Sequence, residues 1–314
     1  IPAIMEMPYN DIIRKFIDMY AGRLRNQVSF MLSACNFYMP IFEEALDAYG
    51  LPLELRYLPI IESALNPSAV SRAGASGLWQ FMIGTGKIYG LESNSLVDER
   101  RDPIKATWAA ARYLKEMYDI YGDWNLVIAA YNCGPGTINK AIRRANGETD
   151  YWKIYNYLPK ETRGYVPAFI AANYVMTYYC DHNICPMETN IPASTDTVQV
   201  NKNLHFEQIA DLCNVPLDQI KSLNPQYKKQ MIPGDSKPYT LRLPIDAIST
   251  FIDKQDTIYA HRADELFRNR KTVAVKEITP STRKTATAVA GKGKLTYYTI
   301  KSGDTLSTIA GKYG

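Results

Sequence analysis

The sequence lacks several features that define whole classes of proteins. No apolar run reaches the roughly eighteen residues that span a bilayer, so no transmembrane helix is expected. Five cysteines form neither an even disulfide framework nor a paired metal motif, and the three histidines are scattered. We therefore expect no structural metal and no cofactor. Cys180 and Cys185 are close enough in sequence to bridge in an oxidising compartment, and two free thiols are the alternative.

A strong excess of basic over acidic residues is absent outside one segment. Residues 1–260 carry 25 basic and 28 acidic side chains, whereas residues 261–294 carry 9 basic and 3 acidic ones. A basic run of this kind usually marks a solvated linker. No motif that interleaves basic and aromatic residues accompanies it, so nucleic-acid binding is not expected. The chain begins with Ile1 and not with methionine, and we expect any export signal or lipid anchor to have been removed.

What the chain does contain is a strong helical pattern. With 314 residues, 46% of them hydrophobic, it can form one sizeable core plus one or two small modules. Apolar residues recur at helical spacing over residues 9–50 and again from Asp102 to Gly122. Asp123 is expected to cap the next helix, and a further helix contains Phe169 and Val175. The predicted fold class is mainly α.

One glutamate stands among apolar residues. Glu62 follows Ile60 and Ile61 at the end of a helical pattern that starts at Pro52, and Pro59 is expected to kink that helix. An apolar setting raises the pKa of a carboxyl group, which suits a proton donor in glycosidic bond cleavage. The alternative is a solvated glutamate on a polar helix face, and spacing alone favours it.

A second carboxylate is missing from the neighbourhood in sequence. No aspartate or glutamate occurs between Glu62 and Glu92. A glycosidase with two carboxylates would have to draw its second acid from elsewhere in the fold. A mechanism in which the N-acetyl group of the substrate is the nucleophile needs only one carboxylate, and it is the interpretation that we prefer.

The loop that follows mixes small residues with aromatic ones. Ser71 opens it, and it leads to Trp79, Gln80, Phe81 and Met82. Glycines in the loop let a ligand approach the backbone, and the Trp79 and Phe81 rings offer faces for stacking sugars. The Gln80 amide can bond hydroxyl or acetamido groups. For each ring, a place in the core is an equally good interpretation.

Further along, Tyr131 and Asn132 lie at a helix end beside a turn. They either face a cleft or serve as a buried ring and a cap. The stretch from Glu161 to Val166 then leads into the last helix of this part of the chain.

Four segments in this order, residues 61–63, 77–82, 130–134 and 161–166, carry a resemblance to a known family. Over roughly residues 9–180 the chain resembles the lysozyme-like catalytic domain of lytic transglycosylases in the goose-type lysozyme superfamily. By that resemblance Glu62 matches the family's acid/base, Ser71 polarises the substrate, and Gln80 and Met82 line the muramic acid subsite. The full set of positions expected to bind substrate is Ser63, Ser71, Gln80, Phe81, Met82, Tyr131, Asn132 and Tyr165.

The resemblance implies a reaction on peptidoglycan glycan strands. Glu62 protonates the leaving oxygen of the β-1,4 bond between N-acetylmuramic acid and N-acetylglucosamine, and the acetamido oxygen attacks the anomeric carbon. The ionised Glu62 then deprotonates the C6 hydroxyl and a 1,6-anhydro ring closes without water, which requires a pKa near working pH. The alternatives are a hydrolytic lysozyme-type muramidase and an inactive peptidoglycan-binding protein.

The second half of the chain changes in character. Residues 191–255 predict a short strand, two helices and a closing strand, which resemble a diverged LysM module that binds N-acetylglucosamine-containing glycan. The alternative is a subdomain that only packs against the catalytic domain. Residues 295–314 resemble the start of a second, truncated LysM module. The predicted organisation is thus a catalytic domain with N-terminal helices (1–190), the first module (191–255), a basic flexible linker (256–294) and the truncated module (295–314).

These expectations together place the protein in the bacterial periplasm or cell envelope. An anchor in the outer membrane, outside this chain, is one arrangement that fits.

Overall fold

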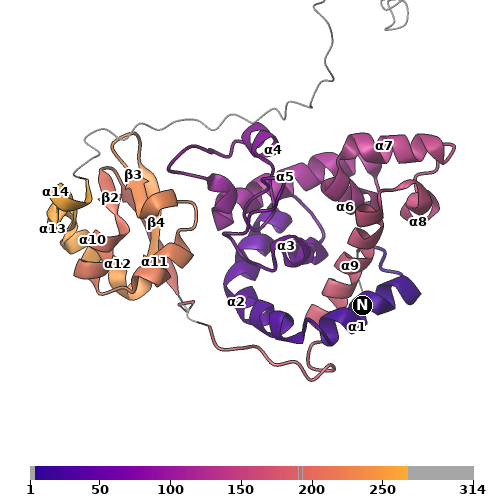
Figure 1. Cartoon of the computed structure of the whole chain (residues 1–314), viewed down its shortest axis with the longest axis horizontal. Helices are drawn as coiled ribbons and strands as arrows, with labels where there is room; N and C mark the ends of the chain where they lie inside the picture. Colours follow the sequence, from indigo (N-terminus) through magenta and orange to yellow (C-terminus); the bar gives the residue numbers. More distant parts are fainter. Residues whose placement is uncertain (1–3, 190, 193, 268–314) are drawn as a thin grey trace, which may run out of the picture. The chain divides into compact units, whose positions relative to one another are not determined.

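The computed structural model describes residues 4–189, 191–192 and 194–267 (Figure 1). The truncated second LysM module and most of the predicted linker lie outside the described residues. The described chain divides into a helical part and a small module of strands and helices.

The helical part consists of nine α-helices in the described ranges, with short 3-10 helices at Leu53–Tyr57, Glu99–Arg101 and Tyr155–Tyr157. The α-helices are α1 (Asp11–Ala21), α2 (Arg25–Ala48), α3 (Leu58–Ser63), α4 (Ile83–Ile88), α5 (Pro103–Tyr121), α6 (Trp124–Cys133), α7 (Pro135–Arg144), α8 (Tyr151–Ile154) and α9 (Lys160–Thr177).

The capping predictions for the middle helices are confirmed. Asp102 accepts hydrogen bonds from the backbone N–H groups of Ile104 and Lys105 at the start of α5, and Gly122 ends that helix with φ of 62°. Asp123 accepts from the Leu126 N–H at 2.7 Å and starts α6. Side chains that satisfy free backbone N–H groups thus fix where each helix begins.

The helices close around one hydrophobic core. Helix α9 packs against α1, α3 and α6, and α2 packs against α5 (Figure 1). The fully buried side chains at the centre include Phe42, Trp79, Leu114 and Phe169. This arrangement holds the short helix α3 between the longer ones, and α3 carries Glu62.

The module follows the predicted order of strand, two helices and strand. Strand β1 (Thr195–Val200) pairs antiparallel with β4 (Tyr239–Pro244), and α10 (Phe206–Cys213) and α11 (Leu217–Leu223) lie between them in sequence. A second antiparallel pair, β2 (Asn203–His205) with β3 (Met231–Pro233), was not predicted. Alternate residues of β4 are buried, as expected for a strand with one face on a core.

The predicted start of the linker at residue 256 is wrong. Helices α12 (Ile245–Asp253), α13 (Gln255–Ala260) and α14 (Ala263–Leu266) continue past it. Ile258 is fully buried in the core of the module, and the amide of Gln208 donates to the carbonyl oxygens of Tyr259 and His261. The basic composition therefore begins only after the module has closed its core.

The module shares its core with a loop of the helical part. Leu96 and Val97 are buried among the apolar side chains of the module. The Asp98 N–H donates to the Gln226 carbonyl at 2.9 Å, and the Lys228 N–H donates to the Leu96 carbonyl at 2.7 Å. The loop from Leu91 to Arg101 thus joins the two parts through backbone hydrogen bonds as well as apolar contact.

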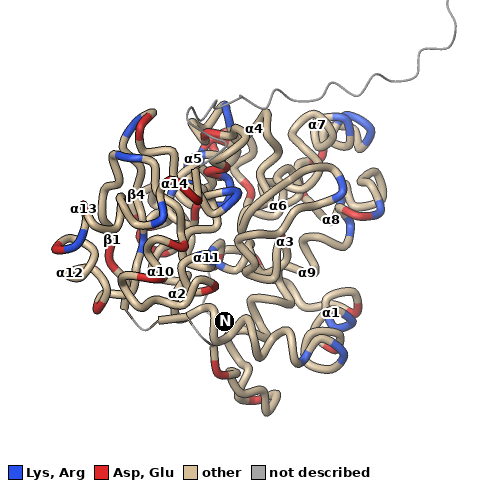
Figure 2. Tube along the Cα trace, turned by 60° about the vertical axis from the view of Figure 1, so that its left-hand side comes forward, with Lys and Arg blue, Asp and Glu red and all other residues tan. Residues whose placement is uncertain are grey.

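Charged residues of both signs are interspersed along the described chain (Figure 2). In the described ranges, no helix has the length and apolar character required to cross a bilayer. All five cysteines carry free thiols, Cys180 and Cys185 among them.

Candidate active site

Glu62 lies at the end of a helix only six residues long. The predicted helix from Pro52 with a kink at Pro59 is instead a 3-10 helix, Leu53–Tyr57, followed by α3, whose first turn contains Pro59. Proline suits that position because its missing N–H has no partner in a first turn. The expected kink is therefore a junction between two helix types, and it sets the direction of α3.

Helix α3 ends sooner than its sequence pattern suggests. Ala64 and Leu65 adopt left-handed backbone conformations, with φ of 51° and 58°. The N–H of Ala64 donates to the Ile60 carbonyl at 3.1 Å, and the Leu65 side chain is buried. Such conformations are costly for residues with a Cβ, and the buried leucine offsets the cost.

The Glu62 side chain lines a cleft of about 460 Å³ and is itself partly exposed. Helix α3, the start of α2 and the loop after α3 form the walls. The lining residues are Tyr20, Leu24, Gln27, Met31, Ile60, Ile61, Glu62, Ser63, Ala64, Ala69, Val70, Ser71 and Gln80. Of the predicted site residues, the cleft thus brings together Glu62, Ser63, Ser71 and Gln80.

Burial raises the pKa of Glu62 to about 7, against an ordinary value of 4.5. The Tyr165 hydroxyl donates a hydrogen bond to Glu62 Oε1, which lowers the pKa, and the negative charge of Glu161 raises it. Burial is the largest of these effects. A carboxyl group with a pKa near 7 can both donate and accept a proton at neutral pH.

Two tyrosines belong to this electrostatic setting. Burial, followed by the charge of Glu62, raises the pKa values of Tyr165 and Tyr131 well above the ordinary range. Both hydroxyls therefore keep their protons. Tyr165 donates to Glu62, whereas Tyr131 donates to the Trp79 carbonyl at 2.7 Å. Tyr165 orients the carboxylate, and Tyr131 holds the loop that forms one side of the cleft.

The polar residues of the cleft are tied to its walls. Ser63 Oγ lies within hydrogen-bonding distance of the Pro59 and Leu78 carbonyls, at 3.0 and 2.9 Å. Ser71 Oγ accepts from the Ala75 N–H at 3.0 Å. The Gln80 amide nitrogen donates to the Ala69 and Gly77 carbonyls. These bonds fix the shape of the loop, so contact of Gln80 with a ligand would fall to its Oε1 atom.

The aromatic rings of the loop are core residues. Trp79 is fully buried, and its Nε1 donates to Thr107 Oγ1 at 2.9 Å. Phe81 is also buried, with the rings of Tyr89 and Tyr113 6.4 Å away. This burial contradicts the prediction that Phe81 offers a face to the substrate. Apolar rings of this size gain more by leaving water than a single stacked sugar would return.

Met82 and Asn132 lie outside the cleft lining. Met82 is 45% exposed and precedes α4. Asn132 accepts a hydrogen bond from Thr162 Oγ1 at 2.9 Å, which ties α6 to α9. Their contact with substrate stays a prediction.

Glu161 was not predicted as a partner of Glu62. Glu161 lies four residues before Tyr165 on α9, a spacing that puts both on one helix face. That spacing was the available signal, because Tyr165 was already a candidate. Tyr20 was also missed as a lining residue because it fits the apolar stripe of α1.

The described ranges contain no cluster of three or more histidine, cysteine, aspartate or glutamate side chains arranged to hold a metal ion. What the cleft presents is one carboxyl group with a pKa near 7, oriented by a tyrosine.

Three family models match segments of the chain. The family model described as "Transglycosylase SLT domain" matches residues 39–154, and "Lytic transglycosylase MltD, LysM-like domain" matches residues 194–260. The model described as "LysM domain" matches residues 298–314, outside the described ranges. These matches agree with the resemblance to lytic transglycosylases, and the predicted fold class is confirmed.

Among curated relatives, the chain is similar to membrane-bound lytic murein transglycosylase D of Escherichia coli K12. The two are 31% identical over 99% of this chain and 64% of that protein, so the chain spans less than two thirds of the relative. Soluble lytic murein transglycosylase of the same strain is 33% identical over 38% of this chain and 19% of its own length. A crystal structure of the 70 kDa soluble lytic transglycosylase of Escherichia coli has a TM-score of 0.40 and 29% identity, over 46% of this chain and 24% of that one.

Proposed function

We propose that the protein cleaves the β-1,4 bond between N-acetylmuramic acid and N-acetylglucosamine in peptidoglycan and leaves 1,6-anhydromuramoyl ends. The observation that carries the proposal is a single carboxyl group with a pKa of about 7, placed in a cleft and held by Tyr165. The match to a transglycosylase domain and the printed names of the relatives, which act on murein, support it.

In the proposed reaction, protonated Glu62 donates its proton to the leaving oxygen of N-acetylglucosamine. The acetamido oxygen of the muramoyl residue attacks C1 as the bond to the leaving oxygen breaks. Glu62, now a carboxylate, takes the proton from the C6 hydroxyl, and O6 displaces the acetamido oxygen at C1. One group acts first as acid and then as base, which works best when its pKa lies near the pH of the reaction.

The remaining site residues have supporting roles in this proposal. Tyr165 aims the Glu62 carboxylate, and Ser71 and Gln80 Oε1 bond the sugar groups that enter the cleft. Met82, Tyr131 and Asn132 retain the substrate-binding roles that the family resemblance implies. The LysM-like module binds N-acetylglucosamine-containing glycan, and the protein works in the cell envelope, as the membrane-bound relative suggests.

The test is a digest of purified sacculi by wild type and Glu62→Gln, with mass spectrometry of the released fragments. We expect anhydro ends from the wild type and no fragments from Glu62→Gln. A variant of the exposed Glu44, Glu44→Gln, should match the wild type. Fragments with reducing ends that contain added water would overturn the proposal in favour of a hydrolytic muramidase.

The hydrolytic alternative has one observation in its favour. A second carboxylate, Glu161, acts electrostatically on Glu62, and a hydrolase needs such a base for its water. In that case Glu161→Gln would abolish cleavage. In the proposed reaction the same variant stays active and still forms anhydro ends. If the protein were an inactive glycan-binding protein, neither the wild type nor Glu161→Gln would release fragments.

A further inference from the structure

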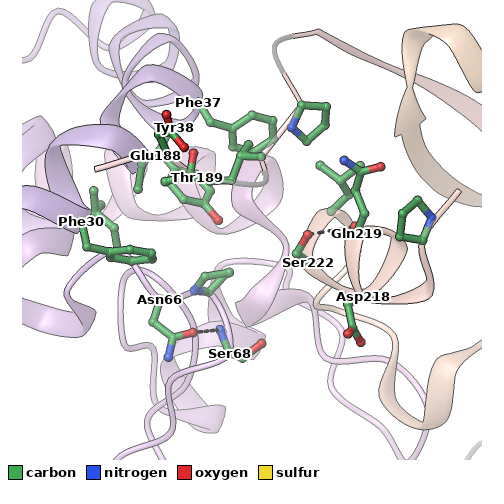
Figure 3. Close-up of a pocket in the computed structure, with 17 residues that line it drawn as sticks. Phe30, Phe37, Tyr38, Asn66, Ser68, Glu188, Thr189, Asp218, Gln219 and Ser222 are labelled. Carbon is green, nitrogen blue, oxygen red and sulfur yellow. Dashed lines mark hydrogen bonds between the residues drawn. The ribbon is translucent and has the colours of Figure 1, made fainter. Parts of the chain in front are cut away.

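A second cavity, of about 1190 Å³, lies between α2 of the helical part and α11 of the module (Figure 3). We call it the junction pocket. Phe30 and Phe37 from α2 lie on one side, and Gln219 and Ser222 from α11 lie on the other. Loop residues that follow α3 complete its lining together with Glu188, Thr189, Ile191 and Pro192.

The junction pocket adjoins the Glu62 cleft along two shared elements. In the loop after α3, Asn66, Pro67 and Ser68 line the junction pocket, and the next residues, Ala69 and Val70, line the cleft. Helix α2 shows the same succession. Gln27 and Met31 line the cleft, whereas Phe30 and Ala34 line the junction pocket. A polymer that extended from the cleft along α2 would meet this pocket.

The lining is suited to uncharged sugars. The Phe30 ring is 46% exposed, and an exposed ring can stack on the apolar face of a pyranose. Asn66, Ser68, Gln219 and Ser222 supply amide and hydroxyl groups, which bond sugar hydroxyls and acetamido groups.

The charges around the pocket argue against a ligand that carries many carboxylates. Glu188 and Asp218 are the ionisable acids of the lining, which contains no lysine or arginine. Asp218 is paired with Lys221, whose Nζ is 3.0 Å from Asp218 Oδ1. A peptide stem brings several carboxylates, whereas a bare N-acetylmuramic acid ring carries only its lactyl carboxylate. The carboxylates of a stem would face Glu188 in a lining that offers no cation.

The segment that closes the pocket is anchored. Ser29 Oγ donates to the Cys185 carbonyl, and Ser33 Oγ donates to the Met187 carbonyl. The Met187 N–H donates in turn to the Ser29 carbonyl at 3.2 Å. The chain that leads to Glu188 is thus fastened to α2, and the pocket wall is formed before a ligand arrives.

From this arrangement we propose that the junction pocket is an accessory subsite for N-acetylated sugar rings without peptide stems. It would bind a peptide-free stretch of a glycan strand while a nearby β-1,4 bond of the same strand lies at Glu62. The position of the bond rests on the proposed function, whereas the binding of sugar to the pocket does not.

The experiment titrates chitohexaose, an uncharged oligomer of N-acetylglucosamine, into the full chain carrying Glu62→Gln, followed by calorimetry. Adding Phe30→Ala, or separately Gln219→Ala, should weaken binding about tenfold, because each removes one wall of the pocket. Ile120→Ala, which alters an even more exposed apolar residue of α5 outside both cavities, should leave binding unchanged. Thermal unfolding of each variant checks that it is folded.

A second arm compares glycan strands before and after enzymatic removal of their peptide stems. Glu62→Gln should bind the stripped strands more tightly, and Phe30→Ala should remove that preference. Two results would disprove the subsite. One is no binding of chitohexaose, and the other is an affinity that neither Phe30→Ala nor Gln219→Ala changes.

The outcomes separate this inference from the proposed function. Anhydro products from the wild type together with no Phe30 effect would leave the reaction standing and remove the subsite. Weaker binding by Phe30→Ala without anhydro products from the wild type would support the subsite and remove the proposed reaction.

Discussion

At the scale of single residues, the raised pKa of Glu62 has a cost in stability. The folded protein holds the Glu62 proton up to a pH of about 7, whereas the unfolded chain releases it near pH 4.5. The free energy of unfolding therefore falls progressively as the pH rises from 4.5 to about 7, by at most about 3 kcal/mol in total. Above pH 7 the full cost is present, and below pH 4.5 it vanishes.

Glu62→Gln should remove this cost. We expect the variant to gain stability relative to the wild type as the pH rises from 4.5 to 8, because its amide does not titrate. Urea unfolding of both proteins at several pH values measures the difference. A constant difference across this range would show that the pKa of Glu62 is not raised.

Replacing Glu161 should change the pKa of Glu62 without altering the Glu62 side chain. Glu161→Gln removes a negative charge that raises the pKa of Glu62, so the pKa should fall. Because Glu62 must be protonated to start the proposed reaction, activity on sacculi should decline at lower pH than in the wild type. Glu44→Gln serves as the matched control. An unshifted alkaline limb would contradict the assigned role of Glu161.

Tyr165→Phe should shift the alkaline limb of the pH–rate profile to higher pH. The Tyr165 hydroxyl stabilises the Glu62 carboxylate, so its loss raises the pKa further and extends activity to higher pH. The maximal rate should fall by roughly tenfold or more, because the carboxylate loses the bond that aims it. A pH–rate profile on sacculi measures both effects. A lower rate with an unmoved limb would indicate that Tyr165 acts only through packing.

At the scale of elements, local signals were sufficient where one side chain decides a helix end. Asp102, Gly122 and Asp123 do so through their own side chain or backbone, which is why α5 and the start of α6 were predicted. Helix α3 differs, because its end depends on burial of Leu65 by distant residues. The rings of Trp79 and Phe81 were ambiguous for the same reason, since a sequence does not show which apolar face is covered.

The loop between α3 and α4 depends on one glycine. Gly77 is buried with φ of +88°, and a Cβ there would lie 1.7 Å from the Arg100 carbonyl oxygen. Gly77→Ala should cost more than about 3 kcal/mol, because the backbone of either segment must move. Gly90→Ala, with φ of +84° and nothing within 4 Å, should cost only about 1–2 kcal/mol of backbone strain. Urea midpoints compare the two, and equal losses would refute the close approach.

At the scale of the described molecule, the module was predictable but its attachment was not. The order of strand, helices and strand follows from local periodicity. The loop that carries Leu96 and Val97 gives no such signal, because its partners lie about 130 residues further along the chain. The junction pocket was missed for the same reason, since its two walls come from α2 and α11.

The docked loop is held by charge as well as by apolar contact. Burial acts to raise the pKa of Asp98, but hydrogen bonds and charge from Arg100, helped by Lys228, hold it below its usual range. Arg100 Nη2 lies 2.8 Å and Lys228 Nζ 3.7 Å from Asp98 Oδ2. The same Lys228 Nζ donates to the Asn94 carbonyl. Breaking the ion pair of the buried Asp98 carboxylate with Lys228 is costly, so separation of the two parts is opposed.

The shared core predicts how the described molecule unfolds. Val97 is fully buried in the core of the module, so Val97→Asp places an unpaired charge there and should uncouple the module. We expect calorimetry to show one transition for the wild type and an earlier, separate one for the variant. Hydrogen exchange should then lose protection in α11 and β4 while α6 and α9 keep theirs. Ile120→Asp, on an exposed position of α5, should leave a single transition. If Val97→Asp also unfolds in one step, with α6 and α9 losing protection together with β4, the two parts form one cooperative unit that the loop alone does not hold together.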